Sequence, residues 1–578
     1  MSAESKSTAQ SSETTENQAA RSWRLVLLFV LLALIASAIL FKLLTLYVQD
    51  QDFLQSQGDA RTLRTTLIPA HRGQITDRNG EPLAVSAPVA TIWADPSKAD
   101  LNHPAIGRLA ALLEQERDEL VGRLSEFRSR QFLYLKRQVT PELAQQITRL
   151  RIPGIHVDRE YKRYYPAAEV TSHLVGFTSV DGEGQEGMEL AYNDWLRGEP
   201  GQKLVLKDRL GRTIKHIRSL EEPDAGEDLQ LSIDLRLQYL AYRELKAAVQ
   251  VHGADGAAAV VLDAHTGEVL ALVNQPSYNP NDRSELHSSA LRNRALTDVF
   301  EPGSPMKSLT VAAALMSGQY QPDTPVDVSP GYIRIKGHTI RDHRNYKELD
   351  LTGIITKSSN VGVTKLTLSM DPDAVRNLMV NVGLGQALGT GFPGEQTGSL
   401  PYISEKQVVE RATMSYGYGL SVTPLQLAHA YLPFANGGLI RPVSLIRQKE
   451  LPPANRVMPE KVANEVLAMM ETVTHRGGTG TRAQVPGYRV AGKTGTTHKI
   501  GSGGYLADQY VSVFAGVAPV TQPEFVIVVM VDNPKGQEYY GGEVAAPVFS
   551  RIGAGALRLL NVAPDSWPDS DGKRMAMN

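Results

Sequence analysis

Three short runs of residues carry side chains that could together acylate a serine. They are residues 304–307 (SPMK), 358–360 (SSN) and 493–496 (KTGT). Serine is a poor nucleophile unless a base takes its proton, and a lysine can be that base when burial or a second cation lowers its pKa. The three runs therefore favour attack by a serine on an amide or lactam carbonyl.

The first run supplies the nucleophile and its base. Ser304 and Lys307 are three residues apart, so on a helix they would share a face. The preceding residues 301–303 (EPG) indicate a loop that leads into a helix start, where the helix dipole favours developing negative charge. A Ser-x-x-Lys spacing alone arises by chance on the order of once in a chain of this length, so its context matters.

The second run offers a relay and an amide. Ser358 could pass a proton between Lys307 and the leaving group, and Asn360 could hold the substrate's amide backbone. Residues 277–279 (SYN) match the same pattern, and either run could simply be a helix cap. We prefer Ser358 because it lies between the other two runs.

The third run has the pattern of an edge strand with a cation. Gly495 removes a side chain, so that a ligand can lie against the backbone. The N–H groups of Thr496 and Ser304 would form an oxyanion hole. Lys493 would bind a carboxylate together with the hydroxyls of Thr494 and Thr496. A tight turn is the alternative when this run is considered alone.

Length and composition bound the class of protein. The chain has 578 residues, 42% hydrophobic and 21% charged, which suits two or three globular domains. A net charge of −2 gives no sign of a nucleic-acid surface. With no cysteine, disulfides, thiolate metal sites and cysteine catalysis are excluded. We expect no metal and no cofactor.

The N-terminal region resembles a membrane anchor. Residues 1–20 are polar and are expected to be disordered, whereas residues 25–48 are apolar apart from Lys42, whose stem can snorkel. Arg21 and Arg24 precede this span and favour an inside N-terminus. A cleaved signal peptide, with its site at residues 36–38 (ASA), is the alternative.

The rest of the chain divides near residue 224. Before it, residues 105–124 and 141–150 have helical spacing within a region that we interpret as a structural pedestal. After it, a helix is expected over 234–251 and a closing helix over 544–560. Strands are expected over 257–262, 268–273, 489–496, 510–517 and 525–531. A sheet assembled from both ends of a domain, with helices from its middle, indicates an α+β fold.

The three runs, in this order, resemble those of the class B penicillin-binding proteins, most closely the division-specific type. The likeness covers about residues 60–560. Other runs that resemble the family are 72–80 (RGQITDRNG), 163–166 (RYYP), 184–187 (GQEG), 415–419 (SYGYG) and 423–427 (TPLQL).

The resemblance implies a fold and a domain order. The fold would be the transpeptidase domain shared with serine β-lactamases, a five-stranded antiparallel sheet with helices on both sides, beside an elongated N-terminal pedestal and one transmembrane helix. The expected parts are a cytoplasmic disordered tail (1–22), a transmembrane anchor (23–48), a pedestal of the dimerisation type (49–223), the transpeptidase domain (224–561) and a C-terminal tail (562–578).

The resemblance also implies an activity and partners. A serine-type D,D-transpeptidase would cross-link septal peptidoglycan: Ser304 attacks the penultimate D-Ala of a stem peptide, and an amine from a neighbouring stem resolves the acyl-enzyme. β-Lactams would mimic D-Ala-D-Ala. The expected location is the bacterial inner membrane, with the N-terminus inside and the catalytic domain in the periplasm. The expected partners are a membrane glycosyltransferase and other proteins of the division machinery, with no nucleic acid.

Two positions depart from the family pattern. Pro305 stands where the family usually has Thr, and Ser308 where it usually has Pro. A residue before proline is pushed away from helical geometry, so Ser304 could be mis-aimed. We keep two alternatives: a β-lactam hydrolase or D,D-carboxypeptidase, which would share the acylation apparatus, and a catalytically weak scaffold or β-lactam sensor, which Pro305 supports. We find no Glu-x-x-Leu-Asn run after Asn360 that would activate water for rapid deacylation.

Overall fold

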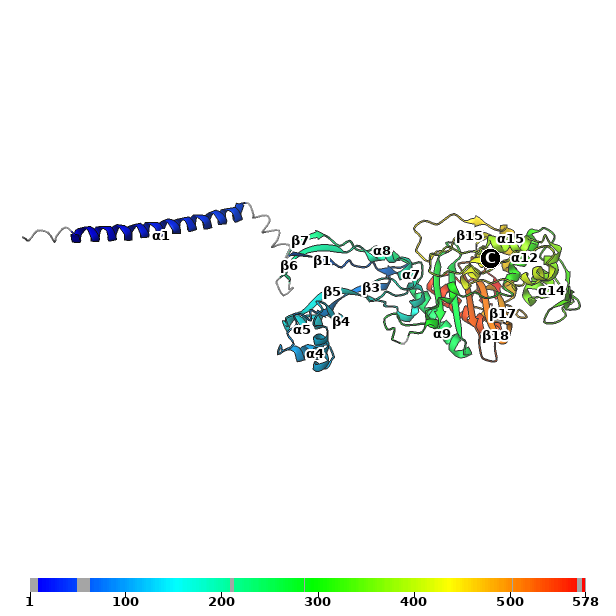
Figure 1. Ribbon diagram of the computed structural model, residues 1–578. Helices are drawn as coiled ribbons and strands as arrows, with labels where there is room; N and C mark the ends of the chain where they lie inside the picture. Colours follow the sequence, from blue (N-terminus) through cyan, green and yellow to red (C-terminus); the bar gives the residue numbers. More distant parts are fainter. Residues whose placement is uncertain are drawn as a thin grey trace, which may run out of the picture.

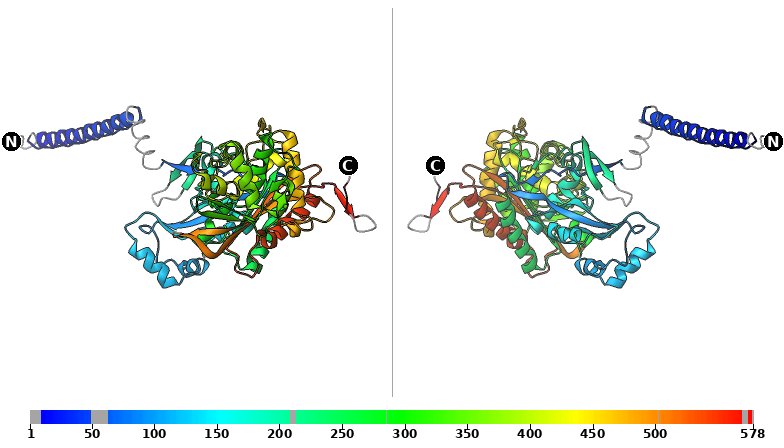
Figure 2. Two further views of the ribbon diagram at one scale, coloured as in Figure 1. Left: turned by 90° about the vertical axis from the view of Figure 1, so that its right-hand side faces the viewer. Right: turned by 90° about the vertical axis from the view of Figure 1, so that its left-hand side faces the viewer.

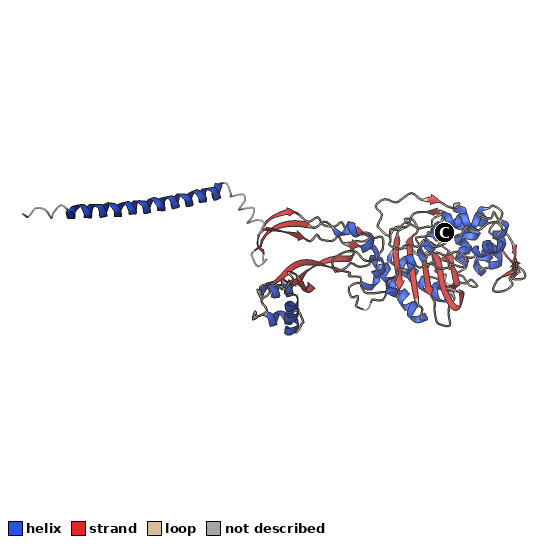
Figure 3. Ribbon diagram, in the orientation of Figure 1, coloured by secondary structure: helices blue, strands red, loops and turns tan. Residues whose placement is uncertain are grey.

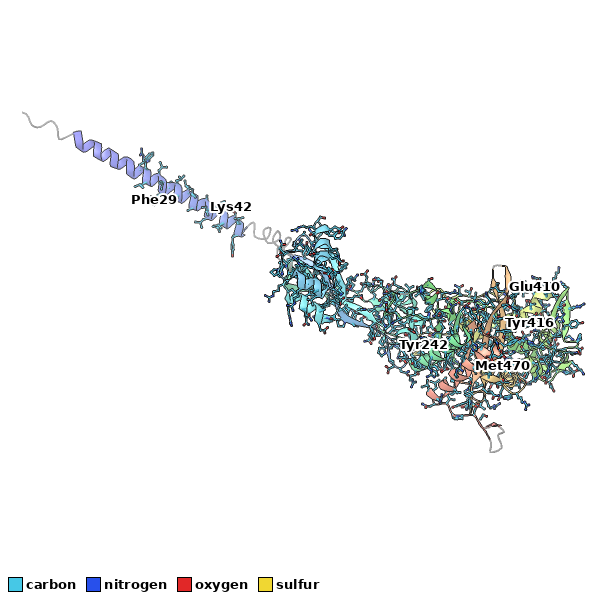
Figure 4. The ribbon with its side chains drawn as sticks, turned by 90° about the horizontal axis from the view of Figure 1, so that it is seen from below. Phe29, Lys42, Tyr242, Glu410, Tyr416 and Met470 are labelled. Carbon is cyan, nitrogen blue, oxygen red and sulfur yellow. The ribbon has the colours of Figure 1, made fainter. Side chains whose placement is uncertain are left out.

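The computed structural model describes residues 9–48, 63–207, 213–284, 286–501, 503–568 and 574–576. Its first element is the helix α1 (Ala9–Val48), which lies apart from the other elements in Figure 1. Among the described helices it alone is long and apolar enough to cross a membrane, over Trp23–Val48. Figure 4 shows Lys42 toward the end of α1 that is nearer the rest of the chain, which suits a snorkelling side chain.

The start of α1 differs from the expected disordered tail. Residues 9–22 are helical and continuous with the apolar span, while residues 1–8 lie outside the described part of the chain. The physical reason is helix cooperativity: the apolar span supplies the costly nucleus, and the Ala, Glu and Gln residues before it are good helix formers that extend it.

The described part of the pedestal contains two β-sheets, and the second of them also includes β8, which lies beyond the boundary expected at residue 223. One has three strands in the order β1-β6-β7, and the other has the order β4-β3-β2-β8 with β5 paired to β3. The strands are β1 (Leu63–Ile68), β2 (Ile75–Thr76), β3 (Pro82–Ala94), β4 (Leu133–Val139), β5 (Ile155–Tyr164), β6 (Gly201–Lys207), β7 (Thr213–Glu221) and β8 (Leu229–Gln230). Figure 3 shows the long strands of these sheets extending away from the C-terminal domain, which gives the pedestal its elongated form.

Helices cover both ends of the pedestal. The far end has its own hydrophobic core, built from α3 (Ile106–Leu112), α4 (Arg117–Glu126) and α5 (Pro141–Arg149) against β3 and β4. The near end holds η1 (Ala168–Val170), α6 (Ser172–Val175), α7 (Gly187–Ala191) and α8 (Asn193–Arg197). There the buried carboxylate of Glu189 binds the guanidinium groups of both Arg72, at 2.7 Å, and Arg163, at 2.6 Å.

The domain after residue 224 is organised around a five-stranded sheet in the order β10-β9-β19-β18-β17, and every neighbouring pair is antiparallel. The strands are β9 (Gly256–Asp263), β10 (Val269–Gln275), β17 (Ala491–Gly501), β18 (Gly504–Ala518) and β19 (Phe525–Asp532). They come from the two ends of the domain, as predicted from the sequence. β17 lies at the edge of the sheet.

Both faces of this sheet are covered by helices, so its strands are apolar on both sides. On one face lie α9 (Leu235–His252) and α19 (Gly541–Leu559), which share a core with Ala257, Ala259 and Val261. On the other face lie α12 (Met306–Met316), α17 (Pro424–Ala435) and α18 (Glu460–Thr472), in the core that contains Val260 and Leu262. The family's expected α+β layers are therefore present.

Most of the remaining elements pack into the core of this second face, whereas η2 packs against α19 on the first face. The helices are α10 (Ser288–Leu291), α11 (Arg294–Thr297), α13 (Leu351–Lys357), α14 (Asn360–Ser369), α15 (Ala374–Asn381), α16 (Val408–Met414) and η2 (Thr481–Ala483). The short strands are β11 (Val326–Asp327), β12 (Tyr332–Ile335), β13 (His338–Arg341), β14 (Glu348–Leu349), β15 (Leu439–Ile440), β16 (Asn455–Arg456), β20 (Ser566–Pro568) and β21 (Arg574–Ala576). In both views of Figure 2 the last strand pair and α1 lie on opposite sides of the molecule.

Candidate active site

The nucleophile candidate stands just before a buried helix. α12 begins at Met306, Pro305 occupies its N-cap position, and Ser304 therefore precedes the helix. Ser304 still lies one turn from Lys307, because its carbonyl oxygen accepts from Lys307 N at 3.1 Å, although it lies just before the helix and not within it. Lys307 lies in the first turn and is fully buried.

Ser358 connects the nucleophile to both lysines. Its hydroxyl donates to Ser304 Oγ at 3.0 Å, while Lys307 Nζ and Lys493 Nζ each donate to Ser358 Oγ at 3.0 Å. Among the residues that the structure describes, Lys307 Nζ makes no hydrogen bond to Ser304 Oγ. The base candidate thus reaches the nucleophile through one intervening hydroxyl rather than by direct contact.

Lys307 is surrounded by acceptors and has little access to water. Besides Ser358 Oγ, its ammonium donates to the carbonyl oxygen of Ser358 at 2.5 Å and to Asn360 Oδ1 at 2.7 Å. Burial lowers its pKa well below that of an ordinary lysine; the positive charge of Lys493 lowers it further, and the carboxylate of Asp342 acts in the opposite direction. Lys307 can therefore lose its proton far more easily than a solvated lysine.

Lys493 is the second buried amine. It extends from the edge strand β17 and is fully buried. Burial lowers its pKa to about 7. Its Nζ also donates to the carbonyl oxygen of Thr494 at 3.2 Å. The two amines share one hydroxyl, an arrangement that disfavours simultaneous positive charge on both.

The second sequence run forms the junction between two helices. Ser358 has a left-handed backbone, with φ of 56°, at the end of α13, and Ser359 caps the start of α14 by accepting from Gly362 N. This sharp junction directs the side chain of Ser358 toward Ser304. The competing run at 277–279 lies elsewhere, because Ser277 Oγ contacts Tyr242 and Glu169 instead.

The strand β17 approaches the nucleophile's loop very closely at Gly495. A Cβ atom there would lie 2.8 Å from Pro305 Cδ and 2.9 Å from the carbonyl oxygen of Pro302. Thr497 Oγ1 fastens the same loop by donating to the carbonyl oxygen of Glu301 at 3.0 Å. We expected the glycine to make room for a ligand, but the protein's own loop fills the space.

The threonines of the third run lie on the other face of the strand. Thr494 and Thr496 line the cleft that Ser304 enters. Their hydroxyls already have protein partners: Thr494 Oγ1 lies 2.8 Å from Thr479 Oγ1, and Thr496 Oγ1 accepts from Gly541 N at 2.9 Å. A bound carboxylate would join these existing networks.

The cleft has a volume of about 610 Å³, and its outer wall is rich in tyrosine. Tyr510 and Tyr539 stack with ring centroids 4.3 Å apart, and Tyr539 and Tyr540 with centroids 4.4 Å apart, while Tyr418 also lines the cleft. Tyr418 belongs to the family-like run 415–419, but the sequence arguments assigned no site role to Tyr510, Tyr539 or Tyr540. The pairing of Tyr510 and Tyr539 depends on two separate segments meeting, which no local pattern indicates.

A second layer of residues supports the nucleophile's loop. The buried Tyr431 donates from its hydroxyl to the carbonyl oxygen of Pro305 at 2.9 Å. Ser308, one of the departures from the family pattern, lies beneath, with Oγ 3.1 Å from the sulfur of Met470. The loop is thus held by hydrogen bonds from Tyr431 of α17 and Thr497 of β17. Ser304 keeps its contact with Ser358 although a proline follows it.

Comparison with known proteins gives concordant matches. Residues 257–554 match the model of the penicillin binding protein transpeptidase domain, and residues 67–231 match that of the penicillin-binding protein dimerisation domain. Peptidoglycan D,D-transpeptidase FtsI from Escherichia coli strain K12 is 45% identical over 96% of this chain and 95% of its own length. The probable peptidoglycan D,D-transpeptidase PbpC of Pseudomonas aeruginosa is 42% identical over 95% of this chain and 97% of its own.

Solved structures agree with these matches. Penicillin binding protein 3 from Mycobacterium tuberculosis, complexed with aztreonam, has a TM-score of 0.67 and 28% identity, covering 86% of this chain and 98% of its own. The transpeptidase domain of penicillin-binding protein 3 from Burkholderia pseudomallei has a TM-score of 0.53 and 43% identity, covering 58% of this chain and 97% of its own.

Proposed function

This chain belongs to the class B penicillin-binding proteins of the division type, the peptidoglycan D,D-transpeptidases, and from that premise we propose the role of each residue in its site. The enzyme acts on peptidoglycan stem peptides and binds β-lactams. The observation that carries our assignment is the run of contacts from Ser304 through Ser358 to two buried lysines.

In the first half of the reaction Ser304 is the nucleophile. Its Oγ attacks the carbonyl carbon of the penultimate D-alanine, and its proton moves through the Ser358 hydroxyl to the neutral amine of Lys307. The bond to the terminal D-alanine then breaks, and the proton passes to the leaving nitrogen. Free D-alanine departs, and an ester on Ser304 remains.

In the second half an amine from a neighbouring stem attacks that ester. The amine gives a proton to the same relay, the ester bond breaks, and Ser304 Oγ is reprotonated as the new amide leaves. The N–H groups of Ser304 and Thr496 would stabilise the oxyanion in both halves, helped by the start of α12. A β-lactam follows only the first half and remains attached.

Substrate binding is assigned to the edge strand and to the second run. Lys493, with the hydroxyls of Thr494 and Thr496, would hold the substrate carboxylate. Gly495 contributes by letting β17 lie against the nucleophile's loop. Asn360 would present its amide to the substrate backbone while its Oδ1 faces Lys307.

We also propose how the chain is placed in the cell. The anchor (23–48) holds the enzyme in the inner membrane as a single-pass protein, with the tail (1–22) in the cytoplasm because Arg21 and Arg24 precede the span. The pedestal (49–223) and transpeptidase domain (224–561), followed by the C-terminal tail (562–578), then lie in the periplasm. A membrane glycosyltransferase of the division machinery would contact the anchor and pedestal.

Mass spectrometry of the adduct formed with benzylpenicillin tests the assignment. The wild-type chain should gain the mass of one intact penicillin on the peptide that contains Ser304 and lose it slowly, and Ser304→Ala should gain none. An adduct on another residue would refute the assignment. Rapid release of hydrolysed penicillin would favour the hydrolase alternative, and a folded wild-type chain that stays unlabelled would favour the scaffold.

A further inference from the structure

A carboxylate outside all three runs holds the second run in place. Asp342 directly follows the strand β13, on the hairpin that β12 and β13 form. Its Oδ1 accepts from Asn360 N at 2.6 Å and from Val361 N at 3.0 Å, and its Oδ2 accepts from Ser359 Oγ at 2.6 Å. One side chain thus binds three consecutive residues at the start of α14.

The same hairpin holds the side chain of Asn360. Asn360 Nδ2 donates to the carbonyl oxygen of Arg341 at 3.0 Å, while Oδ1 of the same amide accepts from Lys307. Asparagine has one acceptor end and one donor end, so fixing Nδ2 on Arg341 leaves Oδ1 directed at Lys307. Asp342 therefore fixes the backbone of Asn360, and the carbonyl oxygen of Arg341 fixes the Asn360 side chain.

These contacts converge on Lys307. Every acceptor of the Lys307 ammonium among the described residues belongs to Ser358 or Asn360. Ser358 directly precedes Ser359, the first residue of the segment that Asp342 holds, and the hydroxyl of Ser359 donates to Asp342. Movement of Asp342 would therefore displace the relay hydroxyl and the amide together.

We propose that Asp342 is a positioning residue for acylation, which holds Ser358 and Asn360 against Lys307 through the start of α14. This inference rests on the proposed function, because it assigns to Asp342 a part in the same reaction. Asp342 acts on the reacting groups only through these neighbours.

The charge of Asp342 supplies a test that a purely structural role would not meet. The charged groups that act on Lys307 in the described chain are Lys493, from β17, and Asp342; the first lowers the pKa of Lys307 and the second raises it. Without the carboxylate charge, burial and Lys493 act unopposed, and the pKa of Lys307 falls further. Acylation needs the neutral amine, so its rise with pH would then move to lower pH.

Asp350 offers a matched control. It caps the neighbouring helix α13 in a similar way, since its Oδ1 accepts from Gly353 N at 2.6 Å, but within the described chain its side chain makes no hydrogen bond to the three runs. Asp350→Asn therefore removes a helix-capping charge of the same type at the other end of the helix that leads to Ser358. It should lower thermal stability while leaving the pH profile of acylation unchanged.

The experiment measures the second-order rate constant of acylation by a fluorescent penicillin, from about pH 6 to about pH 10, on the full chain in detergent. Asp342→Ala should lose on the order of 100-fold, the expected cost of a misplaced catalytic group. Asp342→Asn, which keeps the shape of the side chain, should lose less and should shift the rising limb to lower pH.

Two outcomes separate the inference from the function on which it rests. If both Asp342 variants match Asp350→Asn in rate and in pH profile, while the wild type acylates at Ser304, the positioning role is overturned and the proposed function stands. If the wild type is not acylated at Ser304, the proposed function fails, and the positioning role fails with it. Because Asp342→Asn preserves the size of the side chain, it keeps the test decisive even if Asp342→Ala does not fold.

Discussion

Replacing Gly495 with alanine should slow acylation although it adds no group that can react. The substitution places a methyl group on β17 at the point where the strand meets the nucleophile's loop. The loop cannot easily retreat, because Tyr431 holds Pro305 from the other side and Thr497 holds Glu301. We therefore expect the strain to appear at Ser304, which lies between these two attachments.

The size of the effect follows from the distances. The added Cβ would lie 2.8 Å from Pro305 Cδ, whereas ordinary contact begins near 3.4 Å, so strand and loop must separate by about 0.6 Å. A misplacement of 1 Å can cost on the order of 100-fold in rate, so roughly tenfold is expected here. Overpacking of this kind also costs about 1–3 kcal/mol of stability.

Gly503→Ala is the matched control, since it lies beyond the same strand, in the turn before β18, and a Cβ there would meet nothing within 4 Å. Both variants are compared by thermal unfolding of the free chain and by the acylation rate constant. Gly495→Ala should lower both quantities and Gly503→Ala neither. If Gly495→Ala keeps the wild-type melting temperature and loses only affinity for the penicillin, the glycine serves the ligand, and our explanation from the loop is refuted.

Three further substitutions test other contacts by thermal unfolding. Burial lowers the pKa of Lys493 to about 7, so between about pH 7 and pH 9 the unfolded chain binds one more proton at this residue than the folded chain, and stability rises with pH by up to about 1.4 kcal/mol per pH unit. Lys493→Met should remove this part of the rise in the free energy of unfolding. An unchanged slope of stability against pH would contradict this expectation. Tyr431→Phe leaves the carbonyl oxygen of Pro305 with only the longer bond from Ser308 N, at 3.4 Å, and should cost about 0.5–1.5 kcal/mol and slow acylation; wild-type stability and rate would argue against support of the loop by Tyr431. Glu189→Gln leaves Arg72 and Arg163 buried without their carboxylate and should cost the pedestal about 3–5 kcal/mol, an effect that a wild-type unfolding profile would exclude.

The sequence was sufficient to predict the layers of the catalytic domain, because its strands and helices have strong local signals. The helix expected over 234–251 is α9 (Leu235–His252), which Asp234 caps, and the one expected over 544–560 is α19 (Gly541–Leu559). Helical spacing over residues 105–124 did not show how many helices the span contains. The span forms two helices, α3 and α4, since Glu114 takes a left-handed backbone with φ of 59°, a turn that helical spacing does not reveal.

The candidate site was predictable as a set of residues but not as a set of contacts. Spacing placed Ser304 and Lys307 one helical turn apart, but it did not indicate that the hydroxyl of Ser358 would link their side chains. Asp342 gave no signal at all, because a single aspartate after a short strand is common, and its importance arises only when a hairpin meets α14. Long-range contacts of this kind depend on tertiary packing, which local patterns do not encode.

The hydroxyl of Ser358 explains how protonation of Lys307 can control the nucleophile. A hydroxyl has one proton and two lone pairs, and Ser358 Oγ has three partners: Ser304, Lys307 and Lys493. While Lys307 is charged, both lysines donate to Ser358, whose proton must then point at Ser304, so Ser304 is an acceptor and is not activated. Once Lys307 is neutral, its lone pair must face a donor, and Ser358 Oγ is the only one of its three contacts that carries a proton. Ser358 then donates to Lys307 and accepts from Ser304, so that loss of one buried charge reverses both bonds and aims the proton of Ser304 along the relay.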